Sequence, residues 1–289
     1  MKKIMLIIIM AMAAKAAMPQ QFGQMGRLYQ NPYQTNPAMA GNDGTTSIYL
    51  NYSNQWNKIN GAPKALSLSG STPLNERAYV GLNVFSDKSG LLRKTQGMGT
   101  FAYHFPLGEK QKLRLGVSLS WTDDRLDADK AIGDLDDPLL MGYNDRSSYL
   151  DGNFGVGYTF QSFEAQFSWL SINNKRYGRI ATVDRSLYYA SLAYSFNIDD
   201  NFSLKPRIGY RHLDTGKDNW DVAMAWGVDI VDIYTVYHST NSFTGGFGVR
   251  TEKNFRLGFY YSNEAKETRS FSGGVFDIVV GYVFPPRKK

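Results

Sequence analysis

The sequence predicts an all-β fold, a transmembrane antiparallel β-barrel of about 14 strands that follows a short N-terminal periplasmic segment. Three observations predict it. Apolar and polar residues alternate over most of the chain after residue 46, the connections are long and short by turns, and aromatic residues gather near the ends of the apolar faces. The composition agrees, because 14% of the 289 residues are aromatic and the chain has 28 glycines and 19 tyrosines.

The N-terminus has the pattern of a secretory leader. Lys2 and Lys3 precede an unbroken apolar run at 4–12, and alanines suited to cleavage dominate 13–17. An N-terminal membrane anchor is the alternative, but a helix needs about 20 apolar residues to cross a bilayer, and this run is shorter. We therefore expect residues 1–17 to be a signal peptide.

The charge balance gives no sign of a nucleic-acid partner. The formal net charge is +6, but three lysines belong to the predicted leader, so the mature chain keeps +3. A basic C-terminal tail at 285–289 holds three positive charges, which leaves the body close to neutral. No basic stripe remains that could follow a phosphate backbone. The absence of cysteine excludes disulfides and cysteine metal sites.

Period-two alternation marks the strands. Between residues 112 and 121, leucine, valine and tryptophan alternate with arginine, glycine and serine, as on a strand with two unlike faces. Most candidate strands are close to the 9 to 11 residues that a tilted strand needs to cross a bilayer. In chain order they are 47–56, 64–72, 78–86, 97–105, 112–121, 150–160, 163–170, 187–196, 202–211, 220–230, 231–239, 243–251, 254–262 and 272–284.

The connections between these strands alternate in length. Links at odd positions, such as 87–96 and 122–149, are mostly long and polar, whereas the even links are short. A membrane barrel has this pattern, with tight turns at the periplasmic rim and longer loops outside. We therefore expect residues 46–284 to form one barrel in the outer membrane, after an N-terminal periplasmic segment at 18–45.

The strands of a water-soluble β-sandwich would also alternate apolar and polar residues, so the composition of the two strand faces must distinguish the folds. The apolar faces carry aromatic residues near strand ends, which is the placement of a membrane girdle. The mean hydropathy of −0.37 is compatible with a barrel, which shows lipid only alternate residues, and excludes a multi-helix membrane protein. The aromatic residues near strand ends are Trp56, Phe105, Trp121, Phe160, Phe196 and Tyr261.

The opposite face of the strands is small and weakly charged. It is rich in glycine, serine and asparagine, with scattered Arg114, Arg207 and Arg256 and no ring of one sign. A low lumen charge favours a filled or blocked barrel over an ion-selective channel. An outer-membrane porin or small-solute transporter stays open as the alternative, because the strand pattern alone allows it. The inward glycines include Gly155, Gly157, Gly246, Gly248 and Gly281.

No constellation for catalysis or cofactor binding stands out. The three histidines, His104, His212 and His238, fall on different strands or loops. The loop at 123–137 is rich in aspartate and could bind calcium, but it lacks the glycine and closing glutamate of an EF-hand. Paired glycines lie inside strands rather than before helices, so no phosphate loop is expected. We expect no enzyme, no cofactor and no metal site, with calcium at 123–137 left open.

The segment before the first strand has a stiff path of its own. It contains two Asn-Pro steps, at Asn31 and at Asn36, and each favours an extended residue before a fixed turn. It then ends in Ala38, Ala40 and Gly41, which are small enough to pack tightly where the chain enters the first strand.

Several of these residues together resemble a known family, the PorP/SprF proteins of type IX secretion and gliding motility. The resemblance covers roughly the first quarter of the chain, and Gln34-Thr35 departs from it where the family usually has apolar residues. The residues that carry the resemblance are Gln21-Phe22-Gly23-Gln24, Asn31-Pro32, Asn36-Pro37-Ala38-Met39-Ala40-Gly41, Asn51-Tyr52, Gln55-Trp56 and Gly61-Ala62-Pro63.

The resemblance implies an integral outer-membrane barrel that is an adaptor, not an enzyme. Such proteins are similar in binding one large secreted or surface-anchored protein, through its C-terminal domain, alongside other type IX secretion or motility components. On this analogy the motif residues either contact a partner or only shape the barrel. They are Asn31, Pro32, Asn36, Pro37, Ala38, Ala40 and Gly41 before the first strand, and Gln55, Trp56, Gly61, Ala62 and Pro63 at the first outer hairpin.

Overall fold

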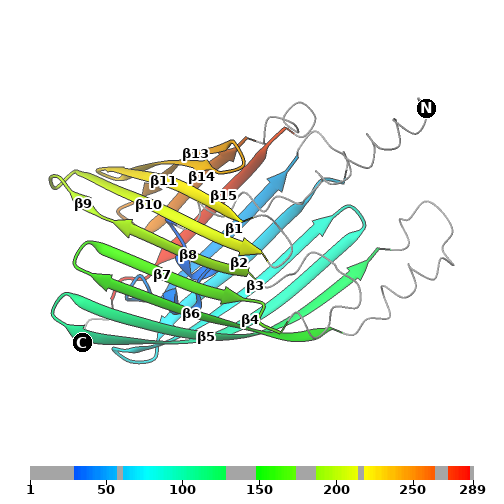
Figure 1. The fold of residues 1–289 in the computed structure, drawn as a ribbon, viewed down its shortest axis with the longest axis horizontal. Coiled ribbons are helices and arrows are strands. Elements are labelled where there is room, and N and C mark those ends of the chain that lie inside the picture. The colour runs from blue at the N-terminus through cyan, green and yellow to red at the C-terminus, as the bar shows by residue number, and fades with distance from the viewer. Residues whose placement is uncertain are drawn as a thin grey trace.

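The protein is a closed, tilted β-barrel with a short segment inside it (Figure 1). The computed structural model describes residues 29–56, 61–127, 148–173, 187–213, 218–263 and 273–286. Two single-turn 3-10 helices, η1 (Pro32–Gln34) and η2 (Pro37–Met39), precede the strands. No helix among these residues is long and apolar enough to cross a membrane. The predicted signal peptide at 1–17 lies outside the described residues.

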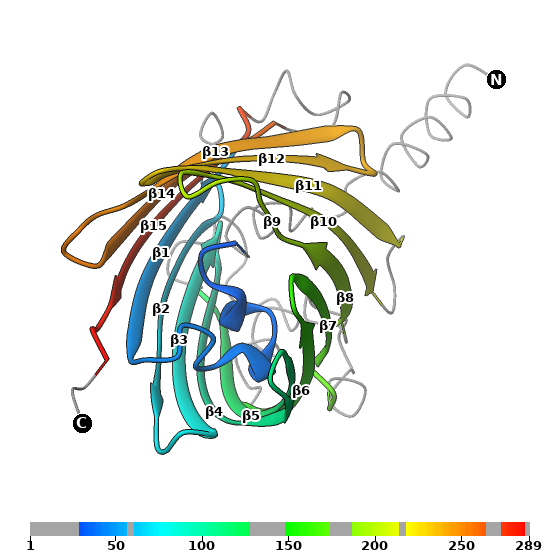
Figure 2. The ribbon, with the colours of Figure 1, turned by 90° about the vertical axis from the view of Figure 1, so that its left-hand side faces the viewer.

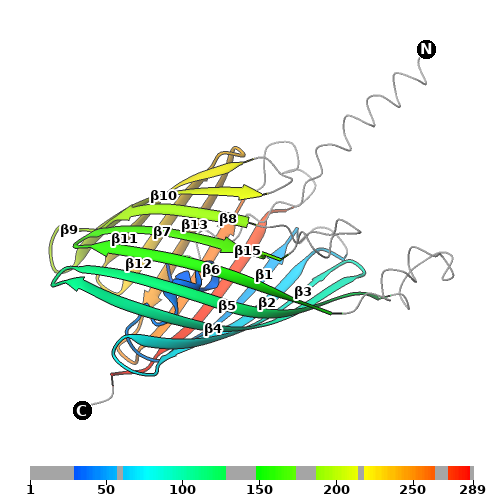
Figure 3. The same cartoon turned by 60° about the horizontal axis from the view of Figure 1, so that its bottom comes forward.

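All strands belong to one antiparallel sheet, and each long strand pairs with its neighbours in the chain (Figure 3). The strands are β1 (Ser47–Gln55), β2 (Lys64–Pro73), β3 (Ala78–Ser89), β4 (Leu92–Gly108), β5 (Gln111–Leu126), β6 (Tyr149–Phe160), β7 (Phe163–Leu170), β8 (Leu187–Tyr194), β9 (Phe196–Asn197), β10 (Phe202–Leu213), β11 (Asn219–Val228), β12 (Val231–His238), β13 (Ser242–Arg250), β14 (Phe255–Ser262) and β15 (Val275–Val283).

The sheet closes because β1 pairs with β15 along its whole length, from Ser47 opposite Val283 to Gln55 opposite Val275. The two-residue β9 continues β8 after a break at Ser195, so fourteen strands form the wall, as predicted. By the register of β10 with β8, Pro206 lies opposite Tyr194, the last residue of β8 before the break. Because proline has no backbone N–H to give to the ladder, the pairing of β10 stops and then resumes on β9.

The faces of the strands are inverted relative to a soluble protein. In β1, Ser47, Asn51 and Ser53 are buried inside the barrel, whereas Ile48 and Leu50 are exposed on the outside. An exterior of this kind needs lipid, so the sandwich alternative is excluded. Five of the predicted girdle aromatics lie within strands and are 38 to 47% exposed on the outer face: Phe105, Trp121, Phe160, Phe196 and Tyr261. Of these, Trp121 lies inside β5 rather than near its end.

The two ends of the barrel differ. The end that carries the tight turns 74–77, 109–110 and 161–162 is called the short-turn end here, and the opposite end is called the long-loop end. The predicted long link at 87–96 is wrong. Strand β3 continues to Ser89 and β4 already begins at Leu92, so the connection is a tight turn. Asp87 lies opposite Lys94 in the extended ladder, and Gly90 has the positive φ of 60° that a tight turn can use.

Candidate functional site

The lumen is occupied by the segment that precedes β1 (Figure 2). Residues 29–46 are called the plug here. Asn36 and Ala38 are 0% exposed, and Met39 is buried as deeply, inside the wall of the barrel. The segment expected at 18–45 therefore has its described part, from Tyr29 onward, within the lumen rather than beyond its rim.

The two Asn-Pro steps give the plug its shape. Each asparagine lies just before a proline that opens a 3-10 turn, because the proline fixes φ for the turn and keeps the preceding residue extended. Asn36 has φ −143° and ψ 111°, and its side-chain oxygen accepts a hydrogen bond from Ala38 N at 3.0 Å. The turns of the plug are therefore stabilised by its own prolines and by the side chain of Asn36.

Hydrogen bonds fix the plug to strands on several sides of the barrel. They join buried or partly buried groups, so an unmade bond would leave a largely desolvated polar atom. Asn31 donates to Ser69 Oγ at 2.8 Å, Tyr33 donates to Thr100 Oγ1 at 2.8 Å, and Asn36 donates to Val156 O at 3.0 Å. Others run from Gln34 to Ser67 Oγ at 2.6 Å, from Ser168 to Thr35 O at 2.7 Å, from Gly41 N to Ser71 Oγ at 3.0 Å and from Gln30 to Leu257 O at 3.1 Å.

Inward glycines of β5 and β6 make room for η2. A Cβ atom at Gly116 would overlap the backbone of Pro37 and Ala38, and one at Gly155 would overlap the side chain of Asn36. No other residue type fits under the plug at these points, since the overlap is with backbone and with a bonded side chain. The wall and the plug are therefore complementary in shape as well as in hydrogen bonding.

Three further contacts hold the two ends of the plug. Where it joins β1, Arg256 Nη1 pairs with Asp43 Oδ1 at 2.9 Å, and Tyr49 OH donates to Asp43 Oδ2 at 3.0 Å. At the other end, Tyr29 OH donates to Lys205 O at 3.2 Å. Burial raises the pKa of Tyr33 to about 12 and also raises that of Tyr29, so both phenols stay protonated donors.

Comparison with known proteins decides the family. The family described as type IX secretion system membrane protein PorP/SprF matches residues 17–282, nearly the whole chain. The chain belongs to the PorP/SprF family. The resemblance carried by the first quarter of the sequence is thereby confirmed over the barrel as well. No curated protein matches the chain.

Solved structures similar to this PorP/SprF protein are outer-membrane barrels. The Acinetobacter baumannii outer membrane protein Omp33 has a TM-score of 0.50 and 8% identity, over 83% of this chain and 98% of that chain. The Ralstonia pickettii toluene transporter TbuX has a TM-score of 0.48 and 12% identity, over 86% and 92%. A Pseudomonas aeruginosa FadL homologue has the same score and identity, over 83% and 90%. With the family match, the fold places this protein as an integral protein of the outer membrane.

The predicted motif residues of this PorP/SprF protein fall into two separate groups. Asn31, Pro32, Asn36, Pro37, Ala38, Ala40 and Gly41 are together in the plug. Gln55, Trp56, Gly61, Ala62 and Pro63 lie around the β1–β2 hairpin at the long-loop end, where Gln55 N donates to Pro63 O at 2.9 Å and Trp56 N to Gly274 O at 2.8 Å. The structure does not bring the second group to the plug.

Sequence reasoning missed the wall side of the plug site. Gly116, Tyr33 and Tyr79 were not singled out, although Gly116 lies on the inward face of an alternating strand, and Gly155 and Gly157 were expected only to face the lumen. The sequence signal for this site was a glycine at an inward strand position. The plug residue that packs on such a glycine could not be predicted from the strand pattern, because it lies far away in the chain.

The histidines serve structural contacts. His104 stacks on Tyr79 with 4.3 Å between ring centroids, beside the plug. His238 joins Asp221 through Nδ1 and Thr244 Oγ1 through Nε2, at 2.8 Å for the latter, in the order of a catalytic triad. His238, Asp221 and Thr244 are buried, and Arg211 also pairs with Asp221 at 2.9 Å, so these residues form one buried polar network.

No metal site is present within the described ranges, where no group of three or more histidines or carboxylates is placed to hold an ion. Asp123 and Asp124 of the aspartate-rich loop belong to β5. Asp127 follows β5 and pairs with Arg93 at 2.6 Å. Residues 128–137 of the loop lie outside the described residues, so calcium binding there stays a prediction.

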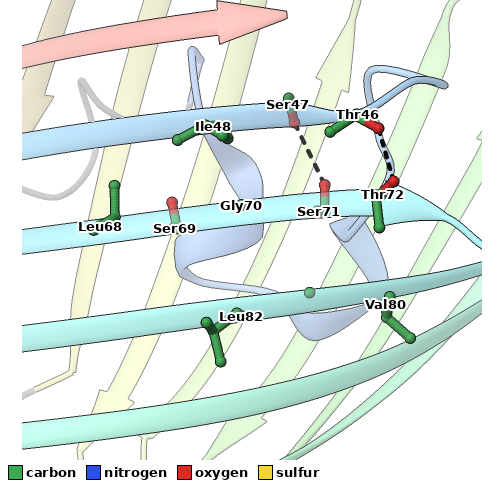
Figure 4. A pocket seen from close by; sticks show the side chains of 11 residues that line it. Thr46, Ser47, Ile48, Leu68, Ser69, Gly70, Ser71, Thr72, Val80 and Leu82 are labelled. Atoms are coloured by element: carbon green, nitrogen blue, oxygen red, sulfur yellow. Dashed lines mark hydrogen bonds between the residues drawn. The ribbon is translucent and has the colours of Figure 1, made fainter. Parts of the chain in front are cut away.

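The outer face has a shallow groove near the short-turn end (Figure 4). Gly70 forms its floor, with Ile48, Leu68 and Leu82 pointing outward around it. The hydroxyls of Thr46 and Thr72 bond each other at 2.7 Å at its rim. The groove faces lipid and is separated from the plug by the wall.

Proposed function

We propose that this PorP/SprF protein is a non-enzymatic adaptor of type IX secretion. It binds one large secreted or surface-anchored protein through that protein's C-terminal domain, and helps its export or holds it at the cell surface. Other type IX secretion or gliding-motility components are its further partners. Family membership supports the pathway, and the filled lumen supports the adaptor role.

The observation that carries the proposal is the plug. Seven of the hydrogen bonds quoted above join it to β2, β4, β6, β7 and β14, on several sides of the barrel. A barrel filled by its own chain uses its rims and its plug as working surfaces instead of an open path. The porin alternative would need the plug to leave, at the cost of desolvated partners along the wall.

Affinity purification of the full protein from detergent-solubilised outer membranes tests the proposal. A tag after Lys289 allows the bound proteins to be identified by mass spectrometry. We expect one large secreted or surface protein, retained through its C-terminal domain, at an amount comparable with the barrel. Recovery of general assembly factors alone would contradict the adaptor role.

The matched control is an unrelated outer-membrane barrel with the same tag, purified from the same membranes. A cargo protein that co-purifies equally with both barrels would count against a specific adaptor. Deletion of the C-terminal domain from the recovered cargo is expected to abolish its retention.

A further inference from the structure

The lumen wall next to the plug has more positive than negative charge. Four cations, Lys112 and Arg114 of β5 and Lys205 and Arg207 of β10, face inward near the short-turn end, together with the single carboxylate of Glu164 on β7. These five residues are called the basic wall here. Arg114 lies close enough to Lys112, Glu164 and Lys205 to interact electrostatically with each.

Both carboxylate oxygens of Glu164 already have partners. Its Oε2 pairs with Lys205 Nζ at 3.0 Å, and its Oε1 pairs with Arg207 Nη2 at 2.8 Å. Gln166 Nε2 also donates to Oε1 at 2.6 Å. The carboxylate therefore pairs directly with both β10 cations, and it forms no ion pair with Arg114 or Lys112 of β5.

Arg114 is the unusual member of the basic wall. It is 9% exposed, its Nε has no acceptor, and its only hydrogen bond among the described residues is a long one of 3.5 Å to Thr159 Oγ1. Neither Arg114 nor Lys112 makes an ion pair within the described part of the chain. A buried guanidinium without an anion is costly, since desolvation is not repaid by pairing.

The position of the pair shows from where an anion would come. Lys112 is exposed and is the first inward residue of β5 after the short 109–110 turn, and Arg114 is the next inward residue, one step deeper. Met39 of the plug and Arg114 both lie next to Gly157, so the plug borders Arg114 on its deeper side. The pair is thus open toward the short-turn end and closed toward the long-loop end.

We propose that Arg114 and Lys112, with the hydroxyl of Thr159, form a site for a carboxylate of an acidic peptide segment that enters at the short-turn end. A guanidinium can hold a carboxylate through two parallel hydrogen bonds, and a lysine at the mouth attracts the charge first. The peptide source rests on the proposed function, in which the partner is a secreted protein, and the positive charge of the pair favours an acidic segment of that partner.

Calorimetric titration of the full protein in detergent tests the site. The probe is a synthetic peptide of glycine, serine and glutamate with a free C-terminus, and its counterpart has glutamine for glutamate and an amidated end. We expect the acidic peptide to bind at least tenfold more tightly than its neutral counterpart. The difference should shrink as salt is raised from low to high ionic strength.

Substitutions locate the binding. Arg114→Gln is expected to weaken the acidic peptide at least tenfold, and Lys112→Gln severalfold. Lys110→Gln removes the same charge from the neighbouring turn, outside the lumen, and is expected to change the affinity by less than twofold. Folding of each variant is checked by its heat-dependent migration in electrophoresis, and the exposed Lys112 keeps the test valid should Arg114→Gln misfold.

Equal binding by Arg114→Gln and the unchanged protein, or no preference for the acidic peptide, would overturn the site. Separate titrations with sodium acetate and inorganic phosphate distinguish the source of the anion. Arg114-dependent binding of these ions without binding of the peptide would overturn the peptide assignment. The synthetic peptide needs no cargo, so a failed affinity purification and a failed titration remain separate results.

Discussion

Single glycines of the wall decide whether the plug fits. Gly155 lies beneath Asn36, Pro37 and Ala38, so the first atom of any side chain there would meet a bonded group. Gly152 lies on the same strand but points the other way, and a Cβ there would meet only Ser118 O at 3.8 Å. Two glycines three residues apart thus have unlike roles.

Gly155→Ala is expected to destabilise the folded barrel by about 1–3 kcal/mol, because the added methyl overpacks the plug. The measurement is urea unfolding of the protein in detergent or lipid vesicles. Gly152→Ala is the matched control and is expected to cause no loss of stability beyond about 0.5 kcal/mol. Equal losses in the two variants would show that the plug does not press on Gly155.

At the scale of elements, the strands were predictable and the plug's place was not. Lipid and lumen select opposite residue types, so alternation located all fourteen wall strands. The ends of β4 were missed, because Arg93 and Lys94 continue the strand with polar residues on both faces. The Asn-Pro steps predicted local turns, but the complementary glycines lie about 80 to 120 residues further along the chain.

The junction between the plug and β1 depends on the Arg256–Asp43–Tyr49 contact. Arg256→Gln is expected to speed amide hydrogen exchange at residues 41–46 several-fold while leaving 31–36 unchanged. Arg250→Gln is the matched control, since Arg250 pairs with Asp232 at 3.2 Å near the same rim and does not touch the plug. Exchange that rises equally in both variants would contradict a local latch.

At the scale of the whole molecule, the barrel and its plug form one closed body. The wall bonds the plug through strands from both halves of the chain, from Ser69 on β2 to Leu257 on β14. Cooperative loss of these contacts would be needed to clear the lumen. The protein is therefore built as a filled cylinder. Its lumen wall carries more charge than the sequence pattern indicated, and several inward arginines pair with carboxylates, as Arg211 does with Asp221.

The purified protein is expected to show no sustained single-channel conductance in planar bilayers. Deletion of residues 29–45 should give steady openings, because it removes the plug and leaves the wall strands intact. Heat-dependent electrophoretic migration checks that the deleted protein is folded, and Gly155→Leu offers a full-length variant in which more frequent openings are expected. Steady, ion-selective opening of the unchanged protein would favour the porin alternative.

The seam between β1 and β15 bears on how the protein is put together. Most of the plug's hydrogen bonds are to β2, β4, β6 and β7, which are among the first seven of the fourteen wall strands. These strands and the plug can associate as a curved half-shell while the later strands are still unpaired. In that order of assembly, the last strand closes around a lumen that is already full, and no open pore need exist at any stage.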